Sequence, residues 1–327
     1  MEKQKPRVYV TRIIAEKALN LLATECEMKL WEGAMPPPRE VLLEAVREID
    51  GLVSLLTDKV DEELLKQALN LRVVSNVAVG YDNIDVNAAT RHGIPIGNTP
   101  GVLTETTADL TFALMMAAAR RLGESERYIR DGKWQTWDPT ALLGVDIFGA
   151  TLGIIGMGRI GQAVAKRARG FEMHVIYCGG GHGYQSQLIG ATRREMDELL
   201  RESDFVSIHC PLTPDTHHLI GERELGMMKP TAILVNTARG GIVDPKALNT
   251  ALKNKQIGYA ALDVTEPEPI HLDDPLLTLD NCLIVPHIGS ASVRTREKMA
   301  MMAVENLLAG LKGERLPHCV NPTVYNR

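Results

Sequence analysis

The first hundred residues alternate short apolar runs with segments of helical periodicity. The apolar runs are "RVYVT" (7–11), "GLVSLL" (51–56) and "LRVVSNVAV" (71–79), and helical segments such as "AEKALNLLATE" (15–25) and "DEELLKQAL" (61–69) follow them. Short, fully apolar strands that alternate with amphipathic helices are typical of a parallel sheet covered by helices. This part of the chain is therefore predicted to be an α/β lobe.

A second series of apolar runs begins near residue 151. Its members are "TLGIIG" (151–156), "HVIYC" (174–178), "DFVSIHC" (204–210), "TAILVNT" (231–237), "GYAALDV" (258–264) and "CLIVPH" (282–287). Helical or turn segments separate them, as in a doubly wound sheet. The second series therefore predicts six strands in one further α/β lobe.

Two long helical segments flank the second series. Residues 104–134 are rich in Ala, Leu and Met, which predicts a long buried helix that connects the lobes. Residues 291–314 are amphipathic and end at Gly313, a typical C-terminal cap, and are expected to return the chain to the first lobe. The prediction is two Rossmann-like, doubly wound parallel-sheet domains with a cleft between them. One domain comprises 1–100 plus 289–327 and is therefore discontinuous, and the other comprises 101–288.

Composition narrows the class of protein. The 327 residues are 45% hydrophobic and 24% charged, as in ordinary globular proteins, and the net charge of −5 with mixed signs argues against a nucleic-acid partner. A leader-like apolar segment and a run of about 18 apolar residues are both missing, so we expect a cytoplasmic protein without a membrane partner. The five cysteines are scattered and are interpreted as reduced thiols. Their spacing, together with that of the histidines, predicts no metal site.

Three glycines predict a phosphate-binding loop. Gly156, Gly158 and Gly161 form G-x-G-x-x-G between a strand and a helix, and a second strand follows at the expected distance. Such glycines allow a tight turn and a close approach of the backbone to a pyrophosphate at a helix N-terminus. A glycine-rich turn without a ligand is the simpler reading, but the strand–turn–helix context favours a dinucleotide site.

The residue that usually selects NAD is missing. An acidic residue is expected about 20 residues after the fingerprint, where it binds the ribose 2′-hydroxyl, but Gly179, Gly180 and Gly181 lie there. His182 and the downstream Arg193 or Arg194 could contact a hydroxyl or a phosphate. The sequence therefore leaves NADH and NADPH open, with NADPH slightly favoured, unless the glycines only form a flexible loop and other contacts decide.

Three polar side chains follow strands of the second series. Arg239 lies in "LVNTARGG", Glu268 in "LDVTEPEP" and His287 in "VPHIG". Taken singly, each fits a structural or surface role. Ligands of open α/β sheets bind at the carboxyl ends of the strands, so the three groups are expected to converge near the dinucleotide. A guanidinium there could bind a carboxylate, and an imidazole could exchange a proton.

At this level of detail the chain resembles the D-isomer-specific 2-hydroxyacid dehydrogenases, and among them the glyoxylate/hydroxypyruvate reductases. The resemblance covers nearly the whole chain and rests on seven motifs in the family's order: "VAVGYDNID" (77–85), "TTADLTFALMMAAAR" (106–120), "GIIGMGRIGQAVAKRA" (153–168), "PLTPDTHHLI" (211–220), "ILVNTARGGIVD" (233–244), "AALDVTEPEP" (260–269) and "PHIGSAS" (286–292).

The resemblance implies roles for the site residues. His287 would be the general acid/base, Glu268 would hold its imidazole and stabilise the charged form, and Arg239 would bind the substrate carboxylate and polarise the 2-oxo group. Substrate would also contact the backbone of Val79 and Gly80, together with Ser290. Cofactor contacts are implied, besides the fingerprint and the glycine run, at Thr107, Arg159, Ile160, Pro211, Thr216, Thr237, Ala238, Asp263 and Gly289. Asp263 would take the nicotinamide amide.

Two further implications concern specificity and assembly. NADPH-using members typically keep an arginine where this chain has Gly180, which leaves cofactor choice open. The segment "KWQTWDP" (133–139) resembles one that inserts a tryptophan into a neighbouring subunit's active site, so Trp137 is a candidate specificity residue in a homodimer. A core or interface aromatic is the alternative for Trp137.

The sequence therefore predicts an NAD(P)H-dependent reductase of small 2-oxo acids, which converts glyoxylate to glycolate or hydroxypyruvate to D-glycerate, with His287 as the proton donor. The alternatives are another D-2-hydroxyacid or phosphite dehydrogenase on the same fold, and a dinucleotide-sensing protein that resembles a corepressor.

Overall fold

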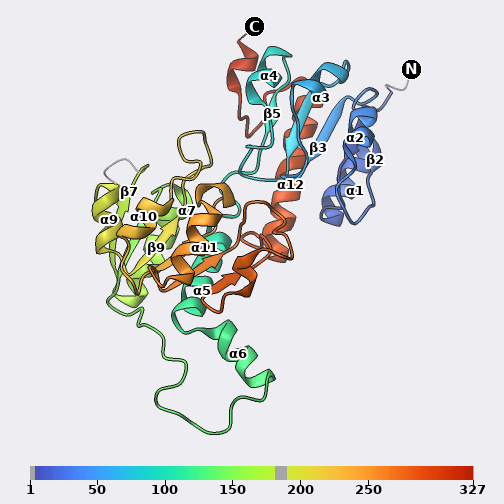
Figure 1. Ribbon diagram of the computed structural model, residues 1–327. Helices are drawn as coiled ribbons and strands as arrows, with labels where there is room; N and C mark the ends of the chain where they lie inside the picture. The colour runs from blue at the N-terminus through green and yellow to red at the C-terminus, as the bar shows by residue number, and fades with distance from the viewer. Residues whose placement is uncertain (1–3, 181–189, 327) are drawn as a thin grey trace. The chain divides into compact units, whose positions relative to one another are not determined.

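The chain folds into two compact units. The structure, a computed structural model, describes residues 4–180 and 190–326 (Figure 1). One unit comprises Met1–Leu103 and Ala291–Arg327, and the other comprises Thr104–Ser290. The boundaries expected from the sequence, at residues 100 and 288, lie within three residues of this division.

The discontinuous unit contains a five-stranded parallel sheet in the order β2-β1-β3-β4-β5. Its strands are β1 (Arg7–Val10), β2 (Glu27–Leu30), β3 (Gly51–Ser54), β4 (Val73–Asn76) and β5 (Ile96–Gly97). Its helices are α1 (Glu16–Glu25), α2 (Arg39–Ala45), α3 (Glu62–Gln67), α4 (Val86–Arg91) and α12 (Val293–Leu311), and a short 3-10 helix spans Pro322–Tyr325. Both faces of the sheet are buried, which explains the nearly continuous apolar runs of β1, β3 and β4.

Helix α12 closes one face of this sheet. Its Val304 and Leu307 are fully buried in one core cluster with Val53 and Val73 of the sheet. The helix ends at Leu311, and Gly313 follows with a φ of 77°, as expected for a C-terminal cap. The segment after residue 290 thus returns to the first unit, as the sequence predicted.

The second unit contains a seven-stranded parallel sheet in the order β12-β11-β10-β9-β6-β7-β8. Its strands are β6 (Thr151–Ile155), β7 (His174–Cys178), β8 (Thr192–Arg193), β9 (Phe205–Ile208), β10 (Ile233–Asn236), β11 (Tyr259–Leu262) and β12 (Cys282–Ile284). Its helices are α5 (Thr104–Ala119), α6 (Leu122–Arg130), α7 (Arg159–Ala168), α9 (Met196–Glu202), α10 (Glu222–Met227) and α11 (Pro245–Lys253). The six predicted strands are all present, and β8 adds a seventh. The fold class predicted from the sequence is confirmed.

The single long helix predicted for residues 104–134 is wrong. The chain forms two helices, and Arg121 between them has a left-handed backbone with a φ of 49°. Helix α5 is apolar and packs in the core, whereas α6 carries "LGESERYIR" and buries none of its residues. The change from Ala- and Met-rich to charged sequence, together with Gly123, marks the break.

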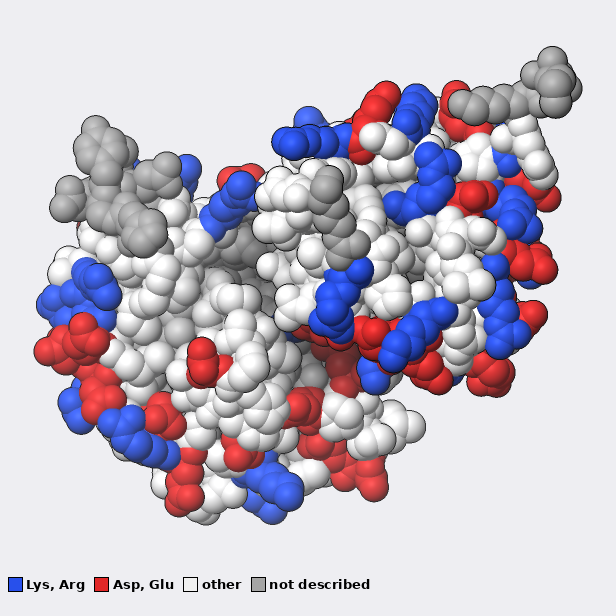
Figure 2. Space-filling model, turned by 90° about the horizontal axis from the view of Figure 1, so that it is seen from above, with Lys and Arg blue, Asp and Glu red and all other residues white. Residues whose placement is uncertain are grey.

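Charged side chains of both signs share the surface of the described residues. On the face seen in Figure 2, Lys and Arg side chains of the described residues are intermixed with Asp and Glu side chains. All five cysteines are thiols. Among the described residues, none of the helices has the length and apolar character needed to cross a membrane.

Candidate active site

Three neighbouring strands bring the predicted chemical groups to one edge of the second sheet. Strands β10, β11 and β12 are adjacent and parallel, with Asn236 opposite Leu262 and Ala260 opposite Cys282. Arg239 follows β10, Glu268 follows β11 and His287 follows β12. Because parallel strands share a carboxyl edge, all three side chains start from the same edge of the sheet.

The turn after β10 lies directly against the loop after β11. A Cβ atom placed on Gly240 would be only 1.9 Å from the carbonyl oxygen of Thr265. Real Cβ atoms do not approach that closely, so only glycine fits at this position. Arg239 is thereby held next to the loop that carries Glu268.

His287 and Glu268 form a hydrogen-bonded pair. The distance from His287 Nδ1 to Glu268 Oε1 is 2.6 Å, and the two side chains are 25% and 33% exposed. His287 has a left-handed backbone with a φ of 52°, an uncommon conformation for a residue other than glycine. A carboxylate on Nδ1 fixes the ring orientation and leaves Nε2 for a second partner. This is the arrangement expected for a histidine that exchanges protons.

Asp263 braces the loop of His287. The carboxylate of Asp263 accepts the backbone N–H groups of Ile288 at 2.6 Å and Gly289 at 2.8 Å, and its carbonyl accepts that of His287 at 2.9 Å. Burial raises the pKa of Asp263, and the two N–H bonds act in the opposite direction. Sequence reasoning assigned Asp263 only to the cofactor and missed this positioning role.

Asn236 has a similar role beside Arg239. This residue is 1% exposed, and its side chain donates to the carbonyl of Arg239 at 2.8 Å and accepts the N–H of Ala238 at 3.0 Å. The guanidinium of Arg239 also donates to the carbonyl of Ala238 at 2.8 Å. A polar residue at the end of an apolar strand was the available signal for Asn236.

His209 is another half-buried group at this sheet edge that sequence reasoning missed. It follows β9, its N–H donates to the carbonyl of Ile155 at 2.7 Å, and its Nε2 lies 2.8 Å from Ser207 Oγ. Burial lowers the pKa of His209 to about 3, so the ring is neutral near pH 7. Within the described part of the chain its Nδ1 is buried without a hydrogen-bond partner.

The three fingerprint glycines occupy three different environments. Gly156 has a φ of 96°, and a Cβ there would lie 2.5 Å from the backbone nitrogen of Cys210. A Cβ on Gly161 would lie 2.3 Å from the carbonyl oxygen of Gly156. Gly158 precedes the first turn of α7, and a Cβ there would meet nothing within 4 Å. The loop is therefore tight at two positions and open at the helix N-terminus, which fits a bound pyrophosphate.

The other predicted cofactor residues lie around this loop or along the same sheet edge. Arg159 and Ile160 form the first turn of α7, and Gly179 and Gly180 follow β7, each with a φ of 64°. Thr237 Oγ1 lies 3.0 Å from that of Thr111 on α5. Gly181 and His182 lie outside the described residues.

Two predicted contacts lie on loops that are braced internally. The Oγ1 atom of Thr216 donates to the carbonyl of Pro211 at 2.6 Å, which closes the loop after β9. A Cβ on Gly289 would lie 2.9 Å from Asp263 Oδ2 and 3.5 Å from Thr107 Cγ2, so Thr107 borders the loop that follows His287. Ser290, the next residue, is 9% exposed.

In the first unit, asparagine side chains orient the loop that contains Val79 and Gly80. Asn98 donates to the carbonyl of Val79 at 2.9 Å, and Asn76 donates to that of Gly80 at 3.1 Å. In a trans peptide the N–H points opposite to the carbonyl. The N–H groups of Gly80 and Tyr81 therefore point away from these asparagines, as donors for an anion would.

Trp137 lies apart from these groups. It belongs to an extended loop between α6 and β6 that projects from its unit (Figure 1), and it is 77% exposed. A side chain this open to solvent is not part of a core in the described chain, so the core-aromatic alternative does not apply to it.

Comparisons with known proteins identify relatives of this chain. Residues 112–289 match the family model "D-isomer specific 2-hydroxyacid dehydrogenase, NAD binding domain". A glyoxylate reductase of Korarchaeum cryptofilum is 54% identical over 98% of this chain and 97% of its own. A protein of Thermus thermophilus has a similar crystal structure, with a TM-score of 0.91 and 47% identity over 96% of this chain and 99% of that one.

A third similar protein was solved with ligands. It is an NADPH-dependent glyoxylate/hydroxypyruvate reductase from Sinorhizobium meliloti in complex with NADP and malonate, with a TM-score of 0.83 and 31% identity over 98% of both chains. The family match, the identities over whole chains and the nucleotide loop all point to one assignment. This chain belongs to the D-isomer specific 2-hydroxyacid dehydrogenase family, and it is an oxidoreductase that uses a nicotinamide cofactor.

Proposed function

We propose that this enzyme reduces small 2-oxo acids, glyoxylate first and hydroxypyruvate second, to glycolate and D-glycerate. The observation that carries the proposal is the His287–Glu268 pair at 2.6 Å, next to the turn of Arg239 and on the same sheet as the nucleotide loop. Relatives of about 50% identity that are named glyoxylate reductase support the substrate.

The chemistry follows from the side chains. When bound, the nicotinamide supplies the hydride to C2 of the substrate. His287 delivers a proton to the oxygen on C2, and Glu268 stabilises the protonated imidazole that precedes this step by accepting from Nδ1. Because the proton transfer occurs as negative charge develops on that oxygen, a correctly placed imidazole lowers the barrier.

Arg239 is the proposed group that binds the substrate carboxylate. A guanidinium can contact a carboxylate through two N–H groups, and its charge also polarises a neighbouring oxo group. In the first unit, the N–H groups of Gly80 and Tyr81, oriented by Asn98 and Asn76, are suitable donors for an anion. Asp263 and Asn236 act as positioning residues because they hold the backbones beside His287 and Arg239.

NADPH is the proposed preferred cofactor. Gly179 and Gly180, the described residues that directly follow β7, carry no carboxylate that would repel a 2′-phosphate. Arg193 of β8 pairs in register with Tyr177 of β7 and is exposed, whereas the guanidinium of Arg194 is bonded to Glu202 at 3.2 Å. Arg193 is therefore the proposed cation for the 2′-phosphate.

The proposed assembly is a homodimer in a reducing compartment such as the cytoplasm. Apolar side chains on α6 and the following loop are strongly exposed, among them Ile129, Trp134, Trp137, Leu143 and Phe148. A protein seldom exposes so many large apolar groups on one segment unless another surface covers them. The five free thiols are consistent with the compartment.

Steady-state kinetics with four 2-oxo acids, each with NADH and with NADPH, test the function. We expect the highest kcat/KM with glyoxylate and NADPH. Rapid turnover only with a larger oxo acid, or oxidation of phosphite in a separate assay with NAD+ or NADP+, would indicate another dehydrogenase of the same fold. Cofactor binding without turnover of any substrate would indicate a dinucleotide sensor.

The variant Arg193→Ala tests the cofactor assignment. We expect it to raise KM for NADPH and to leave KM for NADH unchanged, because only NADPH has the 2′-phosphate. Equal effects on both cofactors, or none, would contradict the role of Arg193.

A further inference from the structure

Two histidines and a glutamate form a compact cluster outside the proposed catalytic groups. His217 and His218 lie on the turn between β9 and α10, and Glu266 lies on the loop after β11. His217 Nε2 is 3.3 Å from Glu266 Oε1, and His218 Nε2 is 2.6 Å from Glu266 Oε2. Each imidazole thus faces its own oxygen of one carboxylate.

The backbone of the turn places both rings on the same side. Consecutive side chains usually point in different directions, but His218 has a left-handed φ of 52°. The two rings stack with their centroids 3.9 Å apart and their planes 22° apart. The N–H of His218 donates to the carbonyl of Gly241 at 2.8 Å, which ties the turn to the segment after β10.

A glycine leaves room for the cluster. A Cβ placed on Gly241 would lie 3.2 Å from Glu266 Oε1 and 3.5 Å from His217 Cδ2. A side chain at this position would crowd both residues. The cluster therefore packs against backbone on one side and is open to solvent on the other. The side chains of His217, His218 and Glu266 are 50%, 36% and 37% exposed.

From this arrangement we infer that His217, His218 and Glu266 form a binding site for a divalent transition-metal ion, of which Zn²⁺ is the representative. Two imidazole nitrogens and one carboxylate are ligands that Zn²⁺ commonly accepts, with water at the remaining position. One potential ligand atom from each side chain lies within 4.8 Å of the others, so small rotations suffice to surround an ion.

A fourth residue completes the arrangement. Asp244 Oδ2 lies 3.9 Å from His218 Nδ1, on the opposite side of the ring from Glu266. When Nε2 of a neutral histidine coordinates a metal, its proton moves to Nδ1 and requires an acceptor, and a carboxylate commonly provides it. Asp244 is fixed for this role because it also caps α11 by accepting the N–H groups of Lys246 and Ala247.

Metal binding would connect two segments that flank the catalytic region. The ion would join the turn after β9 to the loop that carries Glu268 two residues beyond Glu266. Since a ligand that binds only the folded state stabilises it, the ion should raise the melting temperature of the protein. The three side chains of this site are distinct from those proposed to contact substrate and cofactor.

The test uses the full-length protein without an affinity tag, after removal of metals with a chelator. Zn²⁺ is titrated by calorimetry, and Co²⁺ is used as a spectroscopic probe because its visible absorption reports nitrogen and oxygen ligands. We expect one ion per chain and displacement of Co²⁺ by Zn²⁺. The variants are His217→Ala and Glu266→Gln, and His174→Ala, an exposed histidine at the start of β7, is the matched control.

Loss of a ligand should weaken Zn²⁺ binding by at least about tenfold in both variants and leave it unchanged in the control. Glu266→Gln preserves side-chain size, and circular dichroism verifies that each variant is folded. Failure of the wild-type protein to bind either ion, or equal binding by wild type and both variants, would overturn the site. Anomalous scattering at the zinc edge must place the ion among the three side chains, and an ion elsewhere would also refute it.

Discussion

At the scale of single residues, the backbone of His287 determines which substitution tests its role. Its φ of 52° disfavours most side chains, but asparagine tolerates this conformation well. We expect His287→Asn to fold and to lower kcat by at least about 100-fold, because the proton donor is lost. Cofactor affinity, measured by fluorescence titration, should be unchanged. A variant that retains wild-type kcat would exclude His287 as the acid.

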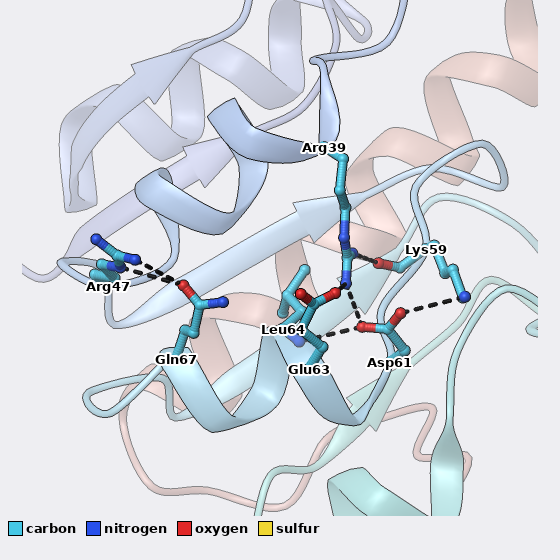
Figure 3. Close-up of polar contacts among 7 residues, drawn as sticks. All are labelled: Arg39, Arg47, Lys59, Asp61, Glu63, Leu64 and Gln67. Carbon is cyan, nitrogen blue, oxygen red and sulfur yellow. Dashed lines mark hydrogen bonds and ion pairs between the residues drawn. The ribbon is translucent and has the colours of Figure 1, made fainter.

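A second residue, Asp61, both caps helix α3 and takes part in ion pairs. Asp61 caps α3 by accepting the N–H of Leu64 at 3.1 Å, and its carboxylate also lies against Arg39 and Lys59 (Figure 3). Burial works against the charged form of Asp61, but the hydrogen bonds from Arg39 and Leu64 outweigh it and lower the pKa. Asparagine can retain the cap, whereas alanine cannot.

We therefore expect Asp61→Asn to reduce the free energy of unfolding by up to about 1 kcal/mol at pH 7, and Asp61→Ala to cost about 1 kcal/mol more. Because the folded-state pKa is lowered, the charge stabilises the fold above the ordinary aspartate pKa of 3.8 and the effect is lost as the pH falls through the lower folded-state value. Urea unfolding across this range should show wild type and Asp61→Asn converging at acid pH. A gap independent of pH would contradict this account.

At the scale of elements, different glycines in the loop between β6 and α7 are expected to affect protein stability and cofactor binding. A Cβ at position 158 meets no atom within 4 Å, so Gly158→Ala should change the free energy of unfolding by less than about 1 kcal/mol. The added methyl group would occupy the space next to the helix N-terminus, and we expect the Kd for NADPH to rise at least about tenfold.

Gly156→Ala should instead destabilise the fold, since both the positive φ and the 2.5 Å approach to Cys210 exclude a side chain. Gly170→Ala, where a Cβ also meets no atom within 4 Å, is the control for both. Chemical unfolding and cofactor titration distinguish the two effects. Normal NADPH binding by Gly158→Ala would place the pyrophosphate elsewhere.

The elements also show what the sequence could predict. Strands β1, β3 and β4 and six strands of the second sheet are continuous apolar runs, so their pattern was sufficient. Strands β5 and β8 have two residues each, and β2 alternates exposed and half-buried positions, so none of them has a strong apolar signal. The break at Arg121 was missed because the apolar character of α5 was extended over the charged residues and Gly123 that follow it.

The candidate side chains of the site could be predicted from the sequence, but the contacts that hold them in place could not. Arg239, Glu268 and His287 follow strands, which can be read from the sequence. The hydrogen bonds that Asp263 accepts from the N–H groups of Ile288 and Gly289 span 25 and 26 residues. The fit of Gly240 against Thr265 depends on two neighbouring strands. Such contacts exist only once the sheet is assembled.

At the scale of the whole molecule, the exposed loop after α6 predicts the assembly. We expect the wild-type protein to elute at twice the chain mass of 35.9 kDa in size-exclusion chromatography with light scattering. The double variant Trp137→Ser, Leu143→Ser should shift toward the monomer, because it removes apolar surface from the proposed interface. Leu272→Ser, at a residue 96% exposed elsewhere in the same unit, should have no effect. A monomeric wild type would refute the dimer.

The return of α12 to the first unit has a consequence for biosynthesis. The strands of the first sheet emerge from the ribosome early. One face of that sheet is covered by Val304 and Leu307 of α12, which are translated only after the whole of Thr104–Ser290. The second unit can therefore complete its core while the first still exposes apolar strands. The unit whose synthesis begins first is therefore expected to finish folding last. Nascent chains stalled before residue 293 should be the ones that chaperones recognise.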